Sequence, residues 1–328
     1  MTTMSLRARL TITALAATLL MSLALGYARL TRDSHGGESA TATATTATGL
    51  AGERIQVLSN GRLSTVARSA PSGPRHISRL RCDRAYAGGR TVVCLTPVGA
   101  LESARLIVLD ADLREQRTVP LDGFPSRARV SADGRMVSWT LFIGGHSYAN
   151  GEFATQTGIL DTTTGELVRS LEVFKVFREG KPYRAADINF WGVTFADDDN
   201  RFYATMSTKN ARYLVEGDLA ARTVRTLTEN VECPSLSPDG TRLAFKQAID
   251  EDPAKGWRLS VLDLRSMRVT HSAETSSVDD QAAWLDDRTL LYGKQRSDGI
   301  NDVWAVPADG GGRPRVLVPE ANSPAPMR

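Results

Sequence analysis

One motif recurs along this chain and restricts its fold more than any other feature: a tight Asp/Gly-rich turn between two short apolar strands. The clearest copy is Ser-Pro-Asp-Gly-Thr-Arg-Leu-Ala-Phe at 237–245. Asp and Gly suit such a turn because its central positions tolerate or require φ > 0. Further copies, each leading into a β-branched or aromatic strand, occupy 87–94, 131–139, 196–204 and 285–292.

A second hairpin follows each of these turns. Its third strands include 107–110, 158–161, 213–216, 260–263 and 303–306, and its fourth strands include 223–227 and 315–318. A four-stranded repeat of about 45 residues is typical of a β-propeller. The 276 residues from 53 to 328 would hold about six such units, of which five are complete.

The sixth unit must combine both ends of this region. Segments 55–59 and 62–67, joined by Asn60-Gly61, are expected to be its third and fourth strands, and 322–328 its inner strand. Such a closure removes the open sheet edges. The sequence therefore predicts an all-β fold, a six-bladed β-propeller with a composite closing blade, preceded by an N-terminal signal or anchor helix.

The N-terminal segment has the form of an export signal. Residues 1–9 carry two Arg and no acid, and residues 10–27 carry no charge. A positive region before an apolar one is typical of a cleaved signal, but a segment of 18 uncharged residues also reaches the minimum length for a membrane span. A cleaved signal and a retained anchor over 10–28 both stay open. The Ala/Thr-rich segment 29–52 is expected to be a disordered spacer.

The body of the protein is close to neutral. The chain has 40 basic and 37 acidic residues, but beyond residue 32 there are 36 basic and 37 acidic ones. Nucleic-acid binding domains carry a concentrated basic excess. The composition therefore argues against a nucleic-acid partner.

Two of the three cysteines are expected to pair. Cys82 and Cys94 would face each other across a hairpin centred on Gly88, if its loop has three residues. Opposed positions of this kind suit a disulfide, and an exported protein meets an oxidising compartment. Two small buried thiols are the alternative. Cys233 is expected to be a packed thiol.

The sequence shows no assembled catalytic motif. Residues 145–149, Gly-His-Ser-Tyr-Ala, approach the Gly-x-Ser-x-Gly pattern of serine hydrolases but lack the last Gly and a following helix. The four His lie in separate segments without metal-ligand spacing. Three consecutive acids at 197–199 occupy a turn of the repeat and are expected to be solvated. We expect no cofactor and no metal.

The connections from each fourth strand to the next inner strand should gather around the central opening. That rim carries both signs of charge, which suits a polar peptide or glycan. The candidate binding residues are Arg127, Arg129, Arg184, Asp187, Asn189, Glu232, Asp279, Asp280 and Gln281.

The repeats also resemble a known family. Residues 237–245, and the run from Ser297-Asp298-Gly299 to Arg315-Val316-Leu317, are similar to the WD-repeat-like motif of TolB-type propellers. The region 75–328 resembles the TolB-like proteins of actinobacterial cell envelopes. The resemblance implies a cell-envelope propeller. Together with the N-terminal segment, it predicts an extracytoplasmic protein, secreted or anchored to the membrane by an N-terminal helix.

These observations lead to a functional hypothesis and an alternative. The hypothesis is a non-catalytic module that binds an envelope protein or a cell-wall polymer, with membrane contact through 10–27 only if that segment is uncleaved. The alternative is a propeller enzyme, a metal-dependent lactonase or lyase or a glycosidase. In that case Asp187, Glu232 and Asp280 would converge at the central channel.

Overall fold

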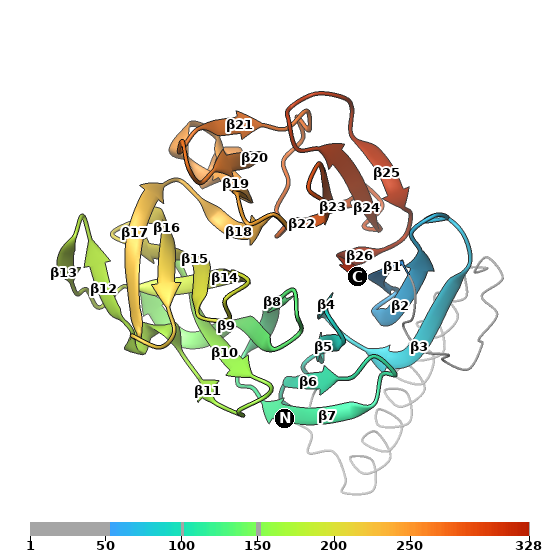
Figure 1. Cartoon of the computed structure of the whole chain (residues 1–328), viewed down its shortest axis with the longest axis horizontal. Helices are drawn as coiled ribbons and strands as arrows, with labels where there is room; N and C mark the ends of the chain where they lie inside the picture. The colour runs from blue at the N-terminus through green and yellow to red at the C-terminus, as the bar shows by residue number, and fades with distance from the viewer. Residues whose placement is uncertain (1–52, 100–101, 149–151, 328) are drawn as a thin grey trace, which may run out of the picture. The chain divides into compact units, whose positions relative to one another are not determined.

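The computed structural model describes residues 53–99, 102–148 and 152–327, which form six β-sheets arranged as blades around a central axis (Figure 1). Contacts between the innermost strands set the order of the blades around the ring. The predicted all-β, six-bladed propeller is confirmed. The expected signal or anchor helix and the spacer, residues 1–52, lie outside the described residues.

Five blades are each built from one continuous stretch of chain with the first strand innermost. Blade 1 contains β4 (Arg84–Gly88), β5 (Thr91–Leu95), β6 (Arg105–Leu109) and β7 (Glu115–Pro120). Blade 2 contains β8 (Phe124–Val130), β9 (Met136–Tyr148), β10 (Glu152–Asp161) and β11 (Leu167–Val168). Blade 3 contains β14 (Asn189–Phe195), β15 (Arg201–Thr208), β16 (Ala211–Asp218) and β17 (Thr223–Glu229). Blade 4 contains β18 (Glu232–Leu236), β19 (Arg242–Ala248), β20 (Trp257–Asp263) and β21 (Val269–His271). Blade 5 contains β22 (Ala283–Asp286), β23 (Thr289–Gln295), β24 (Asn301–Pro307) and β25 (Arg315–Val318).

Blade 6 is composite, as the sequence predicted, but its strand order differs from the expectation. The C-terminal strand β26 (Asn322–Met327) is innermost and pairs with β1 (Arg54–Ser59). The expected third and fourth strands are in fact the second and third, β1 and β2 (Arg62–Ala67). The fourth is β3 (Arg75–Arg81), whose half-exposed, Arg-rich sequence carries little apolar signal.

Blade 3 has two additional strands that were not predicted from the sequence. β12 (Lys175–Arg178) pairs in parallel with β17, and β13 (Lys181–Tyr183) forms a hairpin with it at the outer edge of the ring (Figure 1). Three short 3₁₀ helices complete the described secondary structure: η1 (Leu171–Val173), η2 (Ile249–Glu251) and η3 (Pro253–Lys255). None of the helices in the described ranges is long or apolar enough to cross a bilayer.

The recurring turn has the same hydrogen bonds in its two best copies. Ser237 Oγ donates to Asp239 Oδ1 and accepts from the amide of Arg242, 2.9 Å away. Ser131 and Asp133 form the same network in blade 2. Gly240 follows Asp239 at φ +69°, where a residue with a Cβ is strained. The Ser-x-Asp-Gly pattern therefore specifies the turn through its side chains.

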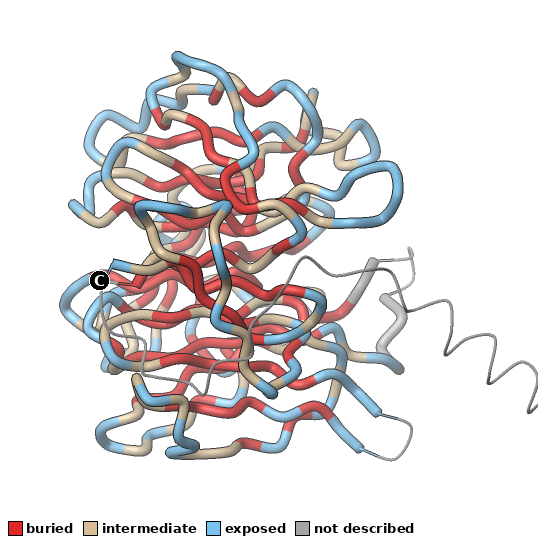
Figure 2. Tube along the Cα trace, turned by 90° about the vertical axis from the view of Figure 1, so that its right-hand side faces the viewer, coloured by how far each residue is buried: buried red, intermediate tan, exposed pale blue. Residues whose placement is uncertain are grey.

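The hydrophobic core lies between neighbouring blades. One layer joins Val93 and Leu106 of blade 1 to Trp139 and Leu141 of blade 2. Figure 2 shows that buried residues follow the strands while exposed ones gather at the loops. Because each blade covers the faces of its two neighbours, burial of apolar area stabilises the ring as a whole.

The structure contains the Cys82–Cys94 disulfide, with a Cα–Cα distance of 5.4 Å. The pairing predicted from the sequence is confirmed, but its geometric reason was wrong. The β4–β5 hairpin has a two-residue turn, so Cys94 lies opposite Ala85 and not opposite Cys82. Cys82 precedes β4, and its amide donates to the carbonyl of Gly61 in blade 6. The bridge therefore links blade 1 to the connection from the closing blade.

Candidate binding face

The two ends of the inner strands define two faces of the ring. We call one the rim face, where the chain enters these strands, and the other the turn face, which carries the Asp/Gly-rich turns. The rim face includes the strand starts Arg84, Phe124, Asn189, Glu232, Ala283 and Asn322. The turn face includes Gly89, Gly134, Asp198, Gly240 and Asp287.

Four of the nine predicted rim residues lie in inner strands, although the sequence predicted them in connections. Arg127 and Arg129 belong to β8, Asn189 begins β14, and Glu232 begins β18. The other five precede inner strands: Arg184, Asp187, Asp279, Asp280 and Gln281. The inner strands start earlier than expected because their first residues pair across to the second strands.

A charged cluster joins blades 2, 3, 4 and 5 at the rim face. Arg127 of blade 2 lies 3.6 Å from Asp279, and Asp279 also pairs with Lys246 of β19. Lys246 Nζ lies 3.6 Å from Glu232 Oε2, and the other carboxylate oxygen of Glu232 contacts Arg212 of β16. We call these residues, together with Arg84 and Asp280, the rim cluster.

Two acids of the rim cluster, Glu232 and Asp279, have pKa values shifted in opposite directions. Burial raises the pKa of Glu232 above its ordinary value, although Lys246 and Arg212 favour its charged form. Desolvation also acts to raise the pKa of Asp279, but Lys246, Arg127 and Arg84 outweigh it and hold that pKa below its ordinary value. The Asp279 side chain remains 69% exposed, so this carboxylate can meet a ligand.

Arg84 of β4 extends the cluster to blade 1. Its Nε donates to the carbonyl of Ser126 at 2.7 Å, and Nη1 of Arg127 donates to the same carbonyl at 2.9 Å. Burial, followed by repulsion from Arg127, lowers the pKa of Arg84, while Asp280 opposes this. Asp280 is itself held by the amide of Gly293 at 2.8 Å.

Two of the predicted residues link blades that are not neighbours in the ring. Nη2 of Arg129 in blade 2 donates to the carbonyl of Ala282, at the start of blade 5 on the opposite side of the ring. Nε2 of Gln281 donates to the carbonyls of Val193 and Pro234 in blades 3 and 4. The centre is thus occupied by side chains that tie distant blades together.

The remaining predicted residues have other roles. Asp187 accepts hydrogen bonds from Thr208 and from the amide of Lys209. Asn189 accepts from Thr155 in blade 2. Arg184 is exposed between β13 and β14.

The metal-dependent form of the enzymatic alternative placed three acids around one ion. In the described ranges, no group of three or more His, Cys, Asp or Glu residues has the arrangement to hold a metal ion. Asp187, Glu232 and Asp280 instead each have protein partners. Cys233 is a buried free thiol, as expected.

Three members of the rim cluster were not among the predicted site residues: Arg84, Arg212 and Lys246. Lys246 directly follows the apolar run Leu243-Ala244-Phe245. A single charged residue at the end of such a strand could have marked it as a candidate site residue. Arg84 and Arg212 lie in strands of other blades, and only the closed ring brings them near the predicted residues.

Exposed aromatic surface lies beside the charged residues. Phe124, three residues before Arg127 in β8, is 61% exposed, and its register partner Phe142 in β9 is also exposed. Large exposed aromatic side chains beside polar groups are typical of interaction surfaces. The rim face therefore combines an apolar anchor with a mixed-charge cluster.

No family model matches the sequence, and no curated protein matches it. Solved structures do match. TolB from Acinetobacter baumannii is 14% identical with a TM-score of 0.60, over 84% of this chain and 67% of that chain. A protein assigned as TolB from Agrobacterium tumefaciens is 13% identical with a TM-score of 0.50, over 83% and 91%. A nidogen–laminin complex matches with 11% identity and a TM-score of 0.57, over 84% and 98%. The similarity is one of fold, and the fold is a TolB-like propeller.

Proposed function

We propose that this protein is an exported, non-catalytic binding module whose rim face binds an envelope protein or a cell-wall polymer. The observation that carries the proposal is the rim cluster beside Phe124. Charged groups from five blades meet there, and the 69%-exposed Asp279 and 61%-exposed Phe124 remain accessible. Aromatic anchors with adjacent charges supply both the affinity and the orientation of a partner.

Three features support an extracytoplasmic location. Residues 1–27 have the composition of an export signal, and the chain holds a disulfide, which persists in oxidising compartments. The TolB-like fold agrees with this location. Mass spectrometry of the mature N-terminus distinguishes a cleaved signal from a retained membrane anchor.

The binding function is tested by capture from envelope extract with matched surface variants. Phe124→Arg should lose the partners that the wild type retains, because it replaces an exposed aromatic anchor with a charge. Val316→Arg makes the same kind of change at an exposed position of β25, in the outer strand of blade 5, and should retain them. Equal recovery with all three proteins would contradict binding through the rim face.

A further inference from the structure

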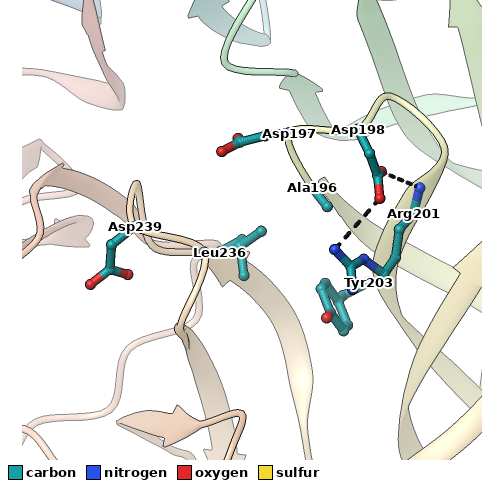
Figure 3. A pocket seen from close by; sticks show the side chains of 8 residues that line it. Ala196, Asp197, Asp198, Arg201, Tyr203, Leu236 and Asp239 are labelled. Carbon is teal, nitrogen blue, oxygen red and sulfur yellow. Dashed lines mark hydrogen bonds and ion pairs between the residues drawn. The ribbon is translucent and has the colours of Figure 1, made fainter.

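A hollow of about 450 Å³ lies on the turn face, between the first turns of blades 3 and 4 (Figure 3). Its volume falls within the range of small-ligand pockets. The charged and apolar side chains that line it are Asp197, Asp198, Arg201, Tyr203, Leu236 and Asp239.

At other junctions on this face, the corresponding turns touch. A Cβ on Gly89 of blade 1 would lie 2.2 Å from the carbonyl oxygen of Asp133 in blade 2. Arg135 of blade 2 lies 3.5 Å from Asp199 of blade 3, and the amide of Asp239 in blade 4 donates to Asp287 of blade 5 at 3.0 Å. None of the hydrogen bonds or ion pairs among the described residues joins the two turns that flank the hollow.

The three carboxylates of the hollow differ in their protein partners. Asp198 accepts from the amides of Asn200 and Arg201 and lies 3.5 Å from the Arg201 guanidinium. Asp239 accepts from Ser237 Oγ and from the amide of Thr241, and it lies 3.6 Å from the Arg242 guanidinium. Asp197 is exposed and has no hydrogen bond or ion pair within the described part of the chain. Figure 3 shows its side chain directed from blade 3 toward Asp239 on blade 4.

The hollow also has apolar walls beside its acidic side chains. Tyr203 is buried at one side and Leu236 lies at the other, so an alkyl chain would meet apolar surface. The lining carries Asp197, Asp198 and Asp239; because Asp198 pairs with Arg201 and Asp239 pairs with Arg242, the excess of negative charge comes from Asp197. A long cationic side chain buries its stem on apolar surface and keeps its charged end near carboxylates.

We propose that this hollow binds an ammonium or guanidinium group on an alkyl stem, the chemistry of a Lys or Arg side chain or of a free alkyl amine. The site lies on the face opposite the rim cluster and does not depend on the function proposed for that cluster. Asp197 supplies the unpaired charge, and Tyr203 and Leu236 supply the contact with the stem.

The test uses ligand-observed NMR with Nα-acetyl-lysine amide, and with Nα-acetyl-norleucine amide as the uncharged control. We expect saturable binding of the lysine probe alone, weakened by added salt. Asp197→Asn should raise its dissociation constant about tenfold, the effect of losing one charge-assisted contact. Asp122→Asn, an equal charge change at an exposed site before β8, should leave it unchanged.

Two further probes separate the sources of the cation. Acetyl-Ala-Lys-Ala-amide binding more tightly than cadaverine indicates a protein partner, and the reverse order indicates a free amine; either order supports a cation site. Equal binding of the norleucine probe, no saturable binding of the lysine probe, or an unchanged constant in Asp197→Asn would overturn the proposal. Asp197→Lys, whose own ammonium should occupy the hollow, provides a second variant, and thermal unfolding verifies that each variant is folded.

Discussion

Gly158 in β10 has no room for a side chain, because a Cβ atom there would lie 2.2 Å from ring carbon Cζ2 of the buried Trp139. Gly158→Ala should therefore reduce the free energy of unfolding by about 1–3 kcal/mol through displacement of the indole. Urea unfolding measures this. Gly144→Ala, in β9 with nothing within 4 Å of its Cβ, is the control and should change stability little. Equal effects of the two substitutions would contradict the packing described.

Asp302 makes the stability of the ring depend on pH. Both oxygens of its buried carboxylate bind Arg296, at 2.6 Å each, and Oδ1 accepts from the amide of Glu320 before β26. The hydrogen bond from Arg296 is the main reason that the pKa of Asp302 lies below its ordinary value. A lowered folded-state pKa means that the contribution is present above the unfolded-state pKa, about 3.9, and is lost as the pH falls.

We therefore expect Asp302→Asn to be less stable than wild type at pH 7, and the difference to shrink between pH 5 and pH 2. Chemical unfolding of both proteins across this range measures the difference. A difference that does not vary with pH would show that ionisation of Asp302 contributes nothing.

The turns are the elements that the sequence specifies most directly. Ser237→Ala removes both the hydrogen bond to Asp239 and the acceptor for the amide of Arg242, so the free energy of unfolding should fall by about 1 kcal/mol. Ser297→Ala, at an exposed position between β23 and β24, should have no measurable effect. Equal stability of the two variants would refute the role of the serine in the turn.

The repeated turns and apolar strands were sufficient to predict six blades and a composite closure. Three strands were missed for physical reasons: β3 of blade 6, and the β12–β13 hairpin of blade 3. β3 lies at the outer edge of blade 6, and its alternating Arg residues carry no apolar pattern. β12 is held by parallel pairing with β17, a strand about 50 residues later, and non-local pairing leaves no local signature.

The candidate site was predicted only in part, because some of its contacts are also non-local. The sequence located Arg127, Glu232, Asp279 and Asp280, because connections and inner strands can be identified from the repeat. Lys246 lies near Glu232 because β18 and β19 pair. It also contacts Asp279 because the connection before β22 returns to the axis. That relation depends on register and ring closure, which spacing along the chain does not reveal.

At the scale of the molecule, closure depends on contacts that join the ends of the ring. The Cys82–Cys94 bridge closes a short loop with a sequence separation of 12 and ties blade 1 to the connection from blade 6. Replacing both cysteines by Ala should lower the free energy of unfolding by about 3 kcal/mol, because the unfolded chain regains loop freedom. Urea unfolding should give the same loss for reduced wild type, and no further loss on reduction of the double variant. Equal stability of oxidised wild type and the double variant would exclude this role.

The polar side chains at the axis link the architecture to its proposed use. Arg129 and Gln281 join blades across the ring, so the inner strands present a fixed platform to the rim face. A rigid platform reduces the entropy that binding must overcome. The accessible surface then includes Asp279 of the rim cluster and the exposed Phe124.

Site-specific photo-crosslinking tests this account most directly. A benzophenone amino acid at position 124, incubated with envelope extract, should give a discrete adduct that excess unlabelled wild type prevents. The same group at position 316, on the outer strand of blade 5, should give no such adduct. A competed adduct at 316 together with none at 124 would contradict the rim face as the binding surface.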